Sequence, residues 1–343
     1  MRQSRIQELL FSRHEDRIDP VSVLEGFPWL AQQNQTCVLS PDSDGLLCGL
    51  FMSHYFHWNV KGFYDGKILV LEQGASAADC IFLDMEVYRK PIRSVGQHML
   101  LYNRNQMPAN WDNFSNCLSP NNLRAYDGKH NFRLKYPFGT IHILLGVLWL
   151  VAEIIVPKVA ITPLLFTDGT WMNLLGYTEN SLNWIHYLRA DDPRNPLHQV
   201  FMNDHYSLHE LMMAMDQFLR RRDELSVPRE RGDRIAITLR GGAQLPHNLE
   251  IRGNGYAFKN EPKQRGESFI RILAELTEWE YKSERWAWEN WQLYQFTKGT
   301  LGGEGGKLNN GTFQSLMAQE PLSFAMTAGN MVEYTLEQPQ KIM

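Results

Sequence analysis

The chain has 343 residues, of which 43% are hydrophobic, and its 34 lysine and arginine residues against 38 acidic residues give a formal net charge of −4. This hydrophobic content is enough for a sizeable core in one large domain or two ordinary ones. The charge balance excludes a basic field over the whole surface, so a nucleic-acid substrate would have to be held by a local groove.

Residues 1–20 carry charges throughout and contain no apolar run before a small-residue cleavage site. This pattern predicts that the protein has no secretory signal and is cytoplasmic. The four cysteines fit this location because they lack CxxC spacing and lie in apolar or mixed surroundings, so we expect free, buried thiols. They are Cys37, Cys48, Cys80 and Cys117.

Short apolar runs in the first half predict strands over residues 36–40, 67–72 and 80–84, each bounded by Gly, Pro or Asp. A helix is predicted between the first two strands, over residues 46–58. Strands separated by segments of helix length indicate a parallel sheet that is covered on both faces.

The segment 140–156 is strongly apolar, but it contains His142 and Glu153. It is also shorter than the roughly 20 residues that a helix needs to cross a bilayer. We therefore predict a buried helix and no membrane partner. Further helices are predicted over 170–189 and over 207–225, the latter with a capping box of Ser207 and Glu210.

A charged segment with Pro and Gly, residues 226–234, predicts a boundary between one domain over 1–226 and a second over 235–343. The second domain is expected to contain strands over 235–242 and 255–260, one long helix over 267–296 and a hairpin over 322–338. The predicted fold class is therefore α/β, a parallel sheet flanked by helices, with a smaller α+β C-terminal domain.

Carboxylates follow two of the predicted strands. Asp42 and Asp44 come directly after the strand at 36–40, and Asp84 ends the strand at 80–84. The carboxyl ends of parallel strands meet at one edge of a sheet, where ligand crevices form. Alternate spacing can point Asp42 and Asp44 at neighbouring positions, which suits hard divalent cations.

Two more candidate ligands lie further along, His98 in "SVGQHM" and Asp168 in "LLFTDGTW". Four aspartates and one histidine from separate elements are a ligand set suited to two Mn2+ or Mg2+ ions. The sequence thus predicts a two-metal site.

These residues give the chain a resemblance to the DHH phosphoesterase superfamily, most of all to its RecJ-like nuclease branch. The segment Asp42-Ser43-Asp44-Gly45 is similar to the Asp-x-Asp-Gly motif of the family, Asp84 resembles its second motif and Asp168 its fourth-motif aspartate. Residues 118–153 are similar to its Asn-Pro segment followed by an apolar helix with a glycine. The resemblance covers residues 36–175.

The resemblance implies metal-dependent hydrolysis of a phosphoester or phosphodiester, with Asp44, Asp84 and His98 as catalytic residues. It implies that Asp84 bridges two ions, with Asp42 and Asp168 on one ion and Asp44 and His98 on the other. Single-stranded nucleic acid or a short oligonucleotide is the implied substrate, and a homodimer is left open.

The chain departs from the family pattern at the third motif, where Asp-His-His is expected and Gly96-Gln97-His98 stands. Ser40 occupies the position of a histidine that many members have before the first aspartate. One ion would then be held weakly, or another histidine would substitute. The candidates for substitution are His54, His57 and His130.

Each site residue also has a structural interpretation. A DSDG segment after a strand is typical of a turn, and Asp84 is placed to cap a helix. The segment around Asp168 is itself a turn signature, and a single histidine such as His98 is commonly a core or surface residue.

The predicted helix at 267–296 is rich in aromatic residues beside Lys282 and Arg285: Trp279, Trp286, Trp288, Trp291 and Tyr294. Such residues either grip single strands by stacking or pack the helix against its own domain or a second copy. Three functions stay open: a RecJ-like nuclease, a phosphoesterase for a small nucleotide or cyclic dinucleotide, and a degenerate binding protein without catalysis.

Overall fold

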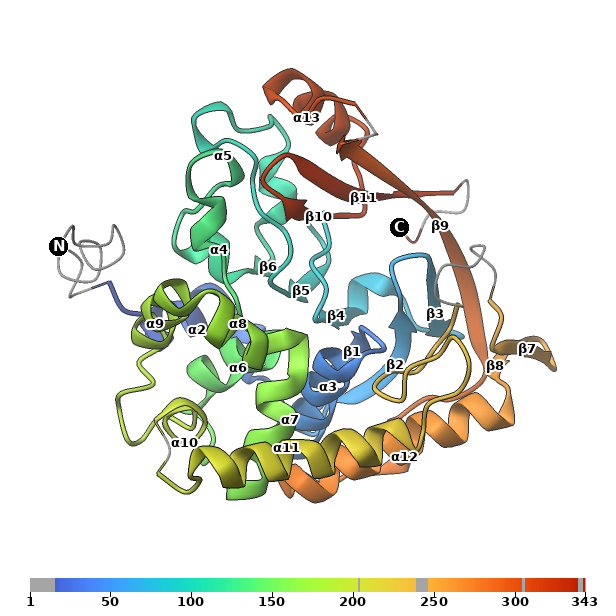
Figure 1. The fold of residues 1–343 in the computed structure, drawn as a ribbon. Coiled ribbons are helices and arrows are strands. Elements are labelled where there is room, and N and C mark those ends of the chain that lie inside the picture. The colour runs from blue at the N-terminus through green and yellow to red at the C-terminus, as the bar shows by residue number, and fades with distance from the viewer. Residues whose placement is uncertain (1–15, 203, 239–245, 304–305, 339–341, 343) are drawn as a thin grey trace, which may run out of the picture.

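The structure is a computed structural model that describes residues 16–202, 204–238, 246–303, 306–338 and 342. A sheet of eleven strands runs through this part of the chain (Figure 1). Across the sheet the order is β10 (Ser323–Ala328), β11 (Met331–Glu337), β9 (Trp291–Gly302), β3 (Ile68–Glu72), β2 (Asn59–Tyr64), β1 (Thr36–Leu39), β4 (Cys80–Leu83), β5 (Arg93–Val95) and β6 (Cys117–Leu118). Beside this path, β8 (Gly255–Phe258) pairs with β7 (Leu249–Arg252) and with β9.

The sheet is mixed, so the prediction of a parallel sheet is confirmed only for one part. Strands β2, β1, β4, β5 and β6 are parallel neighbours. The predicted strand at 67–72 is β3, which pairs antiparallel with β2 and with β9. The reason is the connection: β2 was not predicted, and the few residues between β2 and β3 allow only an antiparallel return.

Helices cover one face of the sheet. Cys37 and Leu39 of β1 point into the larger hydrophobic cluster, which includes buried residues of α3 (Ser43–Phe56) and α6 (Thr140–Leu148). Val38, between them, points into a smaller cluster with residues of strands and connecting segments. No α-helix contributes to this second cluster in the described part of the chain, so the expected helical cover of both faces is not found there.

The predicted buried helix is confirmed as α6, which is buried over its whole length but ends at Leu148 rather than at residue 156. The capping box of Ser207 and Glu210 is confirmed at the start of α11. The neighbouring helices are α7 (Ile161–Phe166), α8 (Thr170–Gly176), α9 (Thr178–Tyr187), α10 (Leu197–Phe201) and α11 (Leu208–Asp223). Among the described residues, no helix has the length and apolar character needed to span a membrane.

The predicted helix over 267–296 is confirmed for residues 267–277, and the rest of the prediction is wrong. Helix α12 (Asn260–Thr277) stops at Glu278, which has a left-handed backbone with φ of 59°. The aromatic residues that follow favour extended structure. Trp286 forms a bridge to Val60, and β9 carries Trp291 and Tyr294 into the sheet. Trp279, Trp286, Trp288 and Trp291 are buried, so they pack the core and form no open stacking platform.

The C-terminal half joins the same sheet through β9, and α12 packs against α3. The predicted hairpin is confirmed as β10 and β11. Residues 235–238 form no strand, and the rest of that predicted strand, 239–242, lies outside the described residues. The domain boundary at 226–234 stays a prediction.

The remaining α-helices are short: α2 (Pro20–Gly26), α4 (Pro120–Leu123), α5 (Gly128–Asn131) and α13 (Asn310–Met317). The four cysteines are free and buried, as predicted.

The turn from β1 into α3 depends on Gly45. A Cβ atom at this position would overlap the backbone carbonyl of Ser40, which cannot move without disturbing β1. We expect Gly45→Ala to lower the free energy of unfolding by about 2 kcal/mol or more, measured by urea denaturation. Gly26→Ala is the matched control because a Cβ atom there meets nothing within 4 Å; equal losses in the two variants would contradict this reading.

Candidate metal centre

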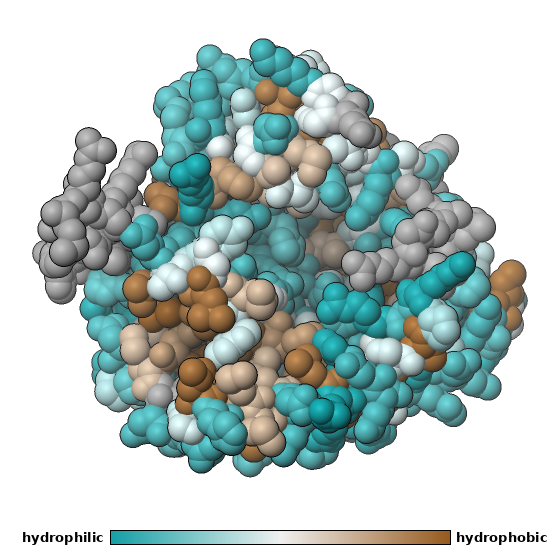
Figure 2. Space-filling model, in the orientation of Figure 1, coloured by the Kyte–Doolittle hydropathy of each residue, from teal (hydrophilic) through white to brown (hydrophobic). Residues whose placement is uncertain are grey.

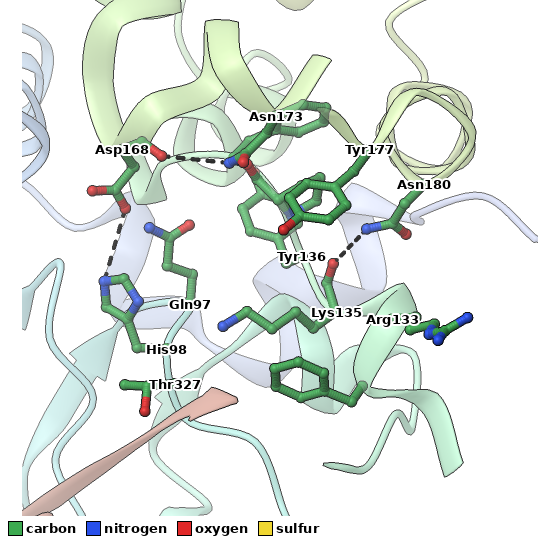
Figure 3. Close-up of a pocket in the computed structure, with 13 residues that line it drawn as sticks. Gln97, His98, Arg133, Lys135, Tyr136, Asp168, Asn173, Tyr177, Asn180 and Thr327 are labelled. Carbon is green, nitrogen blue, oxygen red and sulfur yellow. Dashed lines mark hydrogen bonds and ion pairs between the residues drawn. The ribbon is translucent and has the colours of Figure 1, made fainter. Parts of the chain in front are cut away.

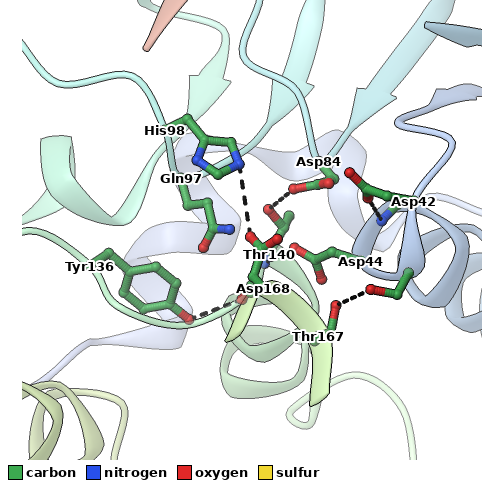
Figure 4. A network of polar contacts seen from close by, with 12 residues as sticks. Asp42, Asp44, Asp84, Gln97, His98, Tyr136, Thr140, Thr167 and Asp168 are labelled. Atoms are coloured by element: carbon green, nitrogen blue, oxygen red, sulfur yellow. Dashed lines mark hydrogen bonds and ion pairs between the residues drawn. The ribbon is translucent and has the colours of Figure 1, made fainter. Parts of the chain in front are cut away.

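The candidate site lies where the order of the parallel strands reverses. After β1 the chain returns to the sheet first on one side, as β2, and later on the other side, as β4. Such a reversal opens a crevice beyond the carboxyl ends of the two diverging strands. Asp42 and Asp44 follow β1, and Asp84 follows β4, so all three stand at this crevice (Figure 4).

Asp44 is fully buried and binds the first turn of α6. Its Oδ2 accepts the backbone N–H of Thr140 at 2.5 Å, and its Oδ1 accepts that of Ile141 at 3.1 Å. Gly139 permits this approach, because a Cβ atom there would lie 2.8 Å from Asp44 Oδ1. A carboxylate at a helix N-terminus satisfies unpaired N–H groups and interacts favourably with the helix dipole.

Asp42 caps a helix and also lines a cavity. Its Oδ1 accepts the backbone N–H of Gly45 at 3.4 Å and caps α3. Its side chain is partly exposed and lines a cavity together with Asp168. The structural role of Asp42 is therefore a helix cap, and the capping carboxylate also faces the cavity.

Asp84, His98 and Asp168 form the tightest group of the cluster. One ligand atom from each lies within 4.8 Å of the other two. His98 Nε2 is 3.8 Å from Asp168 Oδ2, and the Thr140 hydroxyl donates to Asp84 Oδ1 at 2.8 Å. Asp84 and Asp168 both have left-handed backbones, with φ of 59° and 50°; such strain costs energy and is concentrated at functional sites.

These three residues fit a hard divalent cation. Two carboxylate oxygens and one imidazole nitrogen are ligands that Mn2+ accepts, and Asp168 Oδ2 is buried and accepts no hydrogen bond from the described residues. Burial raises the pKa of Asp84 and of Asp168 well above the usual value, and the charges of Asp44 and Asp42 raise both further. A bound cation would relieve this repulsion.

The imidazole of His98 is in the form that ligates metals. Desolvation and the nearby charge of Lys135 lower the pKa of His98, so the ring is neutral at pH 7. Its side chain is 48% exposed, and it faces a cavity.

Three cavities meet at this cluster, in the hollow at the centre of the face in Figure 2. The lysine cavity, about 610 Å3, is lined by Lys135, His98 and Asp168 among others (Figure 3). The arginine cavity, also about 610 Å3, is lined by Arg231, Arg234, Asp42 and Asp168. The hairpin cavity, about 120 Å3, lies between Asp84, His98 and the hairpin of β10 and β11.

The segment 134–137, which carries Lys135, is fastened by side chains of α8 and α9. Trp184 donates to the carbonyl of Leu134 at 2.8 Å, Asn180 to that of Lys135 at 2.8 Å and Asn173 to that of Pro137 at 2.6 Å. Lys135 in turn donates to the carbonyl of Met326 at 3.2 Å. Its cation is thereby held at the wall of the lysine cavity.

All five predicted site residues lie around the same crevice, but their grouping differs from the expected one. His98 stands with Asp84 and Asp168, whereas it was expected beside Asp44. The distances between ligand atoms support one group of three ligands, and a second ion stays a prediction. His54 accepts the N–H of Glu280, and His130 pairs with Asp127, so neither substitutes for a missing ligand.

Sequence reasoning missed Thr140, Lys135 and Glu86. Thr140 is the first residue of α6 and was hidden in an apolar run. Lys135 stands between Leu134 and Tyr136, two residues after Arg133, in a segment that matches no catalytic motif. Glu86 repeats, after Asp84, the alternate spacing that drew attention to Asp42 and Asp44, and this spacing was the available signal.

Comparison with protein-family models gives no match, and comparisons with curated proteins and with solved structures find no significant similarity.

Asp44 makes the metal-free protein sensitive to pH. Burial raises its pKa from 3.8 to about 6, so the folded state retains a proton that the unfolded state releases between these values. Stability should therefore fall as the pH rises through this window, by about 1.4 kcal/mol per pH unit for one carboxyl group. We expect urea unfolding in EDTA to show a shallower pH slope for Asp44→Asn than for the parent protein.

Asp191→Asn controls for the loss of a carboxylate, since Asp191 is an exposed partner of Arg17. This variant should retain the slope of the parent. A slope that Asp44→Asn leaves unchanged would contradict the assignment.

Proposed function

We propose that the chain is a metal-dependent phosphodiesterase of the DHH type that hydrolyses single-stranded nucleic acid or short oligonucleotides in the cytoplasm. The observation that carries the proposal is the convergence of Asp84, His98 and Asp168, from three distant segments, at a strand-order reversal beside Asp42 and Asp44.

Asp84, His98 and Asp168 would hold a Mn2+ or Mg2+ ion, and Asp42 and Asp44 are the proposed ligands of a second ion. When bound, such ions supply positive charge that activates water and stabilises the negative charge developing on phosphoryl oxygens. Asp44 and Thr140 hold the ligands in place, since Asp44 fastens α6 and the Thr140 hydroxyl orients Asp84.

Lys135 provides the cation for the substrate. Burial lowers its pKa, while the charges of Glu86 and Asp168 raise it, and the ammonium group lines the lysine cavity beside Asp168. A phosphate at the carboxylate cluster would lie next to this charge, so we assign to Lys135 the binding of a nonbridging phosphate oxygen.

Two cavities favour a diester over a monoester. Asp168 lines both the lysine cavity and the arginine cavity, each of about 610 Å3. A phosphodiester has two substituents on phosphorus, and each would find a cavity with aromatic walls and basic residues. The basic residues are Arg133 and Lys135 in one and Arg231 and Arg234 in the other.

The second candidate is a phosphoesterase for a small nucleotide or cyclic dinucleotide, which the same ligands would serve. The third is a degenerate binding protein, which the altered segment Gly96-Gln97-His98 supports. In all three, nucleic acid would be held by the cavities and not by the buried tryptophans. The homodimer stays a prediction.

Manganese-dependent hydrolysis of bis-p-nitrophenyl phosphate tests for catalysis. We expect the parent protein to release nitrophenol with Mn2+ and to stop in EDTA, and Asp84→Asn to lose about a hundredfold or more of the rate. The reason is that Asp84 is a central member of the ligand group.

Asp191→Asn should retain the activity of the parent, and circular dichroism should show that both variants fold. A parent protein that binds Mn2+ without turnover would leave only the degenerate binding protein. A parent protein that neither binds Mn2+ nor hydrolyses the ester would remove both enzyme candidates and leave the degenerate binding protein.

The role of the arginine cavity in binding one substituent of the diester can be tested separately from catalysis. Arg234 lines the arginine cavity but is not a member of the group of three ligands. We expect Arg234→Ala to raise KM for labelled oligonucleotides about tenfold, since one charge-assisted contact to phosphate is lost, and to leave the rate on bis-p-nitrophenyl phosphate unchanged.

Initial rates on oligonucleotides of increasing length distinguish the nuclease from the small-nucleotide phosphoesterase. A parent enzyme with equal rates on mononucleotide esters and on longer chains would favour the small-nucleotide phosphoesterase. An unchanged KM in Arg234→Ala would remove the arginine cavity from the substrate path.

A further inference from the structure

The loop that carries His98 rests on a buried carboxylate that no motif includes. Glu86 is 4% exposed and lies behind the loop of residues 96–99. Its Oε1 accepts the backbone N–H of Met99 at 2.7 Å, and the backbone N–H of His98 also interacts with the carboxylate. The amide groups of His98 and Met99 thus face one carboxyl group, whose pKa burial raises to about 7.

Gly96 leaves room for this carboxylate. A Cβ atom at residue 96 would lie 2.7 Å from both Cδ and Oε2 of Glu86 and 2.8 Å from its Cγ. A Cβ atom at residue 96 would therefore force the carboxyl group of Glu86 out of its present position, because the two cannot occupy the same space. The position at which the resemblance expects an aspartate is therefore filled, in space, by the side chain of Glu86.

The other supports of the loop are uncharged. Gly96 donates its N–H to the carbonyl of Leu118 at 3.1 Å, and Asn121 donates to the carbonyl of Gln97 at 2.9 Å. The carbonyl of His98 accepts the N–H of Met326 at 3.4 Å. These contacts hold the loop on its carbonyl side and at its start, whereas Glu86 holds the N–H groups of the segment that presents the imidazole.

The geometry points to Glu86 as a positioning residue that replaces a side chain at residue 96 and fixes His98 against Asp84 and Asp168. Asp84 would then be a ligand of the metal. Glu86, two residues later, would support the loop that carries the histidine ligand. This inference deepens the proposed function and rests on it for the metal. The exchange, in which the side chain of residue 86 takes the space of a side chain at residue 96, does not depend on that function.

Four variants test the exchange: Glu86→Ala, Glu86→Gln, Gly96→Asp and the double variant Glu86→Ala/Gly96→Asp. Mn2+ binding to the metal-free protein is measured by titration calorimetry. Glu86→Ala should weaken binding about ten- to a hundredfold, as losses of groups that orient a metal ligand do. Glu86→Gln should remain close to the parent, because the amide oxygen can still accept the N–H of Met99.

The double variant is decisive. Gly96→Asp alone should lower the melting temperature and weaken Mn2+ binding, because two side chains compete for one space. Combined with Glu86→Ala, the aspartate should recover most of the affinity that Glu86→Ala loses. Asp127→Asn is the control: Asp127 is also buried and accepts backbone N–H groups, from Arg104 and His130, but it lies outside the ligand group.

The outcomes separate this inference from the proposed function. If the parent binds Mn2+ and Glu86→Ala binds it equally well, the positioning role is wrong and the proposed function stands. If the parent does not bind Mn2+, the proposed function fails, and metal-free melting of the four variants still tests the exchange through its non-additivity. If Glu86→Ala does not fold, a double variant that also fails to fold, or folds without Mn2+ affinity, overturns the inference.

Discussion

The carboxylate of Asp44 joins two parts of the chain that are 96 residues apart, and the geometry of the site depends on this contact. By accepting the N–H groups of Thr140 and Ile141, it fixes the start of α6 against the end of β1. Thr140 then directs its hydroxyl to Asp84, at the end of the neighbouring strand. The buried contacts of Asp44 and Thr140 thus fix β1, β4 and α6 relative to one another.

The same arrangement brings negative charges together at a cost. Burial and mutual repulsion raise the pKa of Asp44, Asp84 and Asp168, which opposes their ionisation. Hydrogen bonds from α6 and from Thr140 offset part of this cost for Asp44 and Asp84. Asp168 Oδ2 has no such donor among the described residues, and this makes a cation the natural complement of the cluster.

The C-terminal half illustrates how tertiary pairing overrides local pattern. The aromatic segment after α12 has the length and the spacing of a helix, but a left-handed Glu278 ends the helix and Trp291 starts β9. Pairing with β3 lets buried tryptophans fill the core beside Phe63 and Phe258. The chain thereby extends the sheet and carries the hairpin of β10 and β11 to the edge of the site.

The strands at 36–40 and 80–84, the buried helix from residue 140 and the carboxylates at the strand ends could be predicted from the amino-acid sequence, because apolar runs and their polar boundaries are local signals. Only the tertiary structure decided which ligands group together, since the placement of His98 and Asp168 depends on loops whose path no local pattern encodes. It also decided the roles of Thr140, Lys135 and Glu86. Their importance lies in contacts with residues far along the chain, such as that of Lys135 with Met326, or in the space left by Gly96.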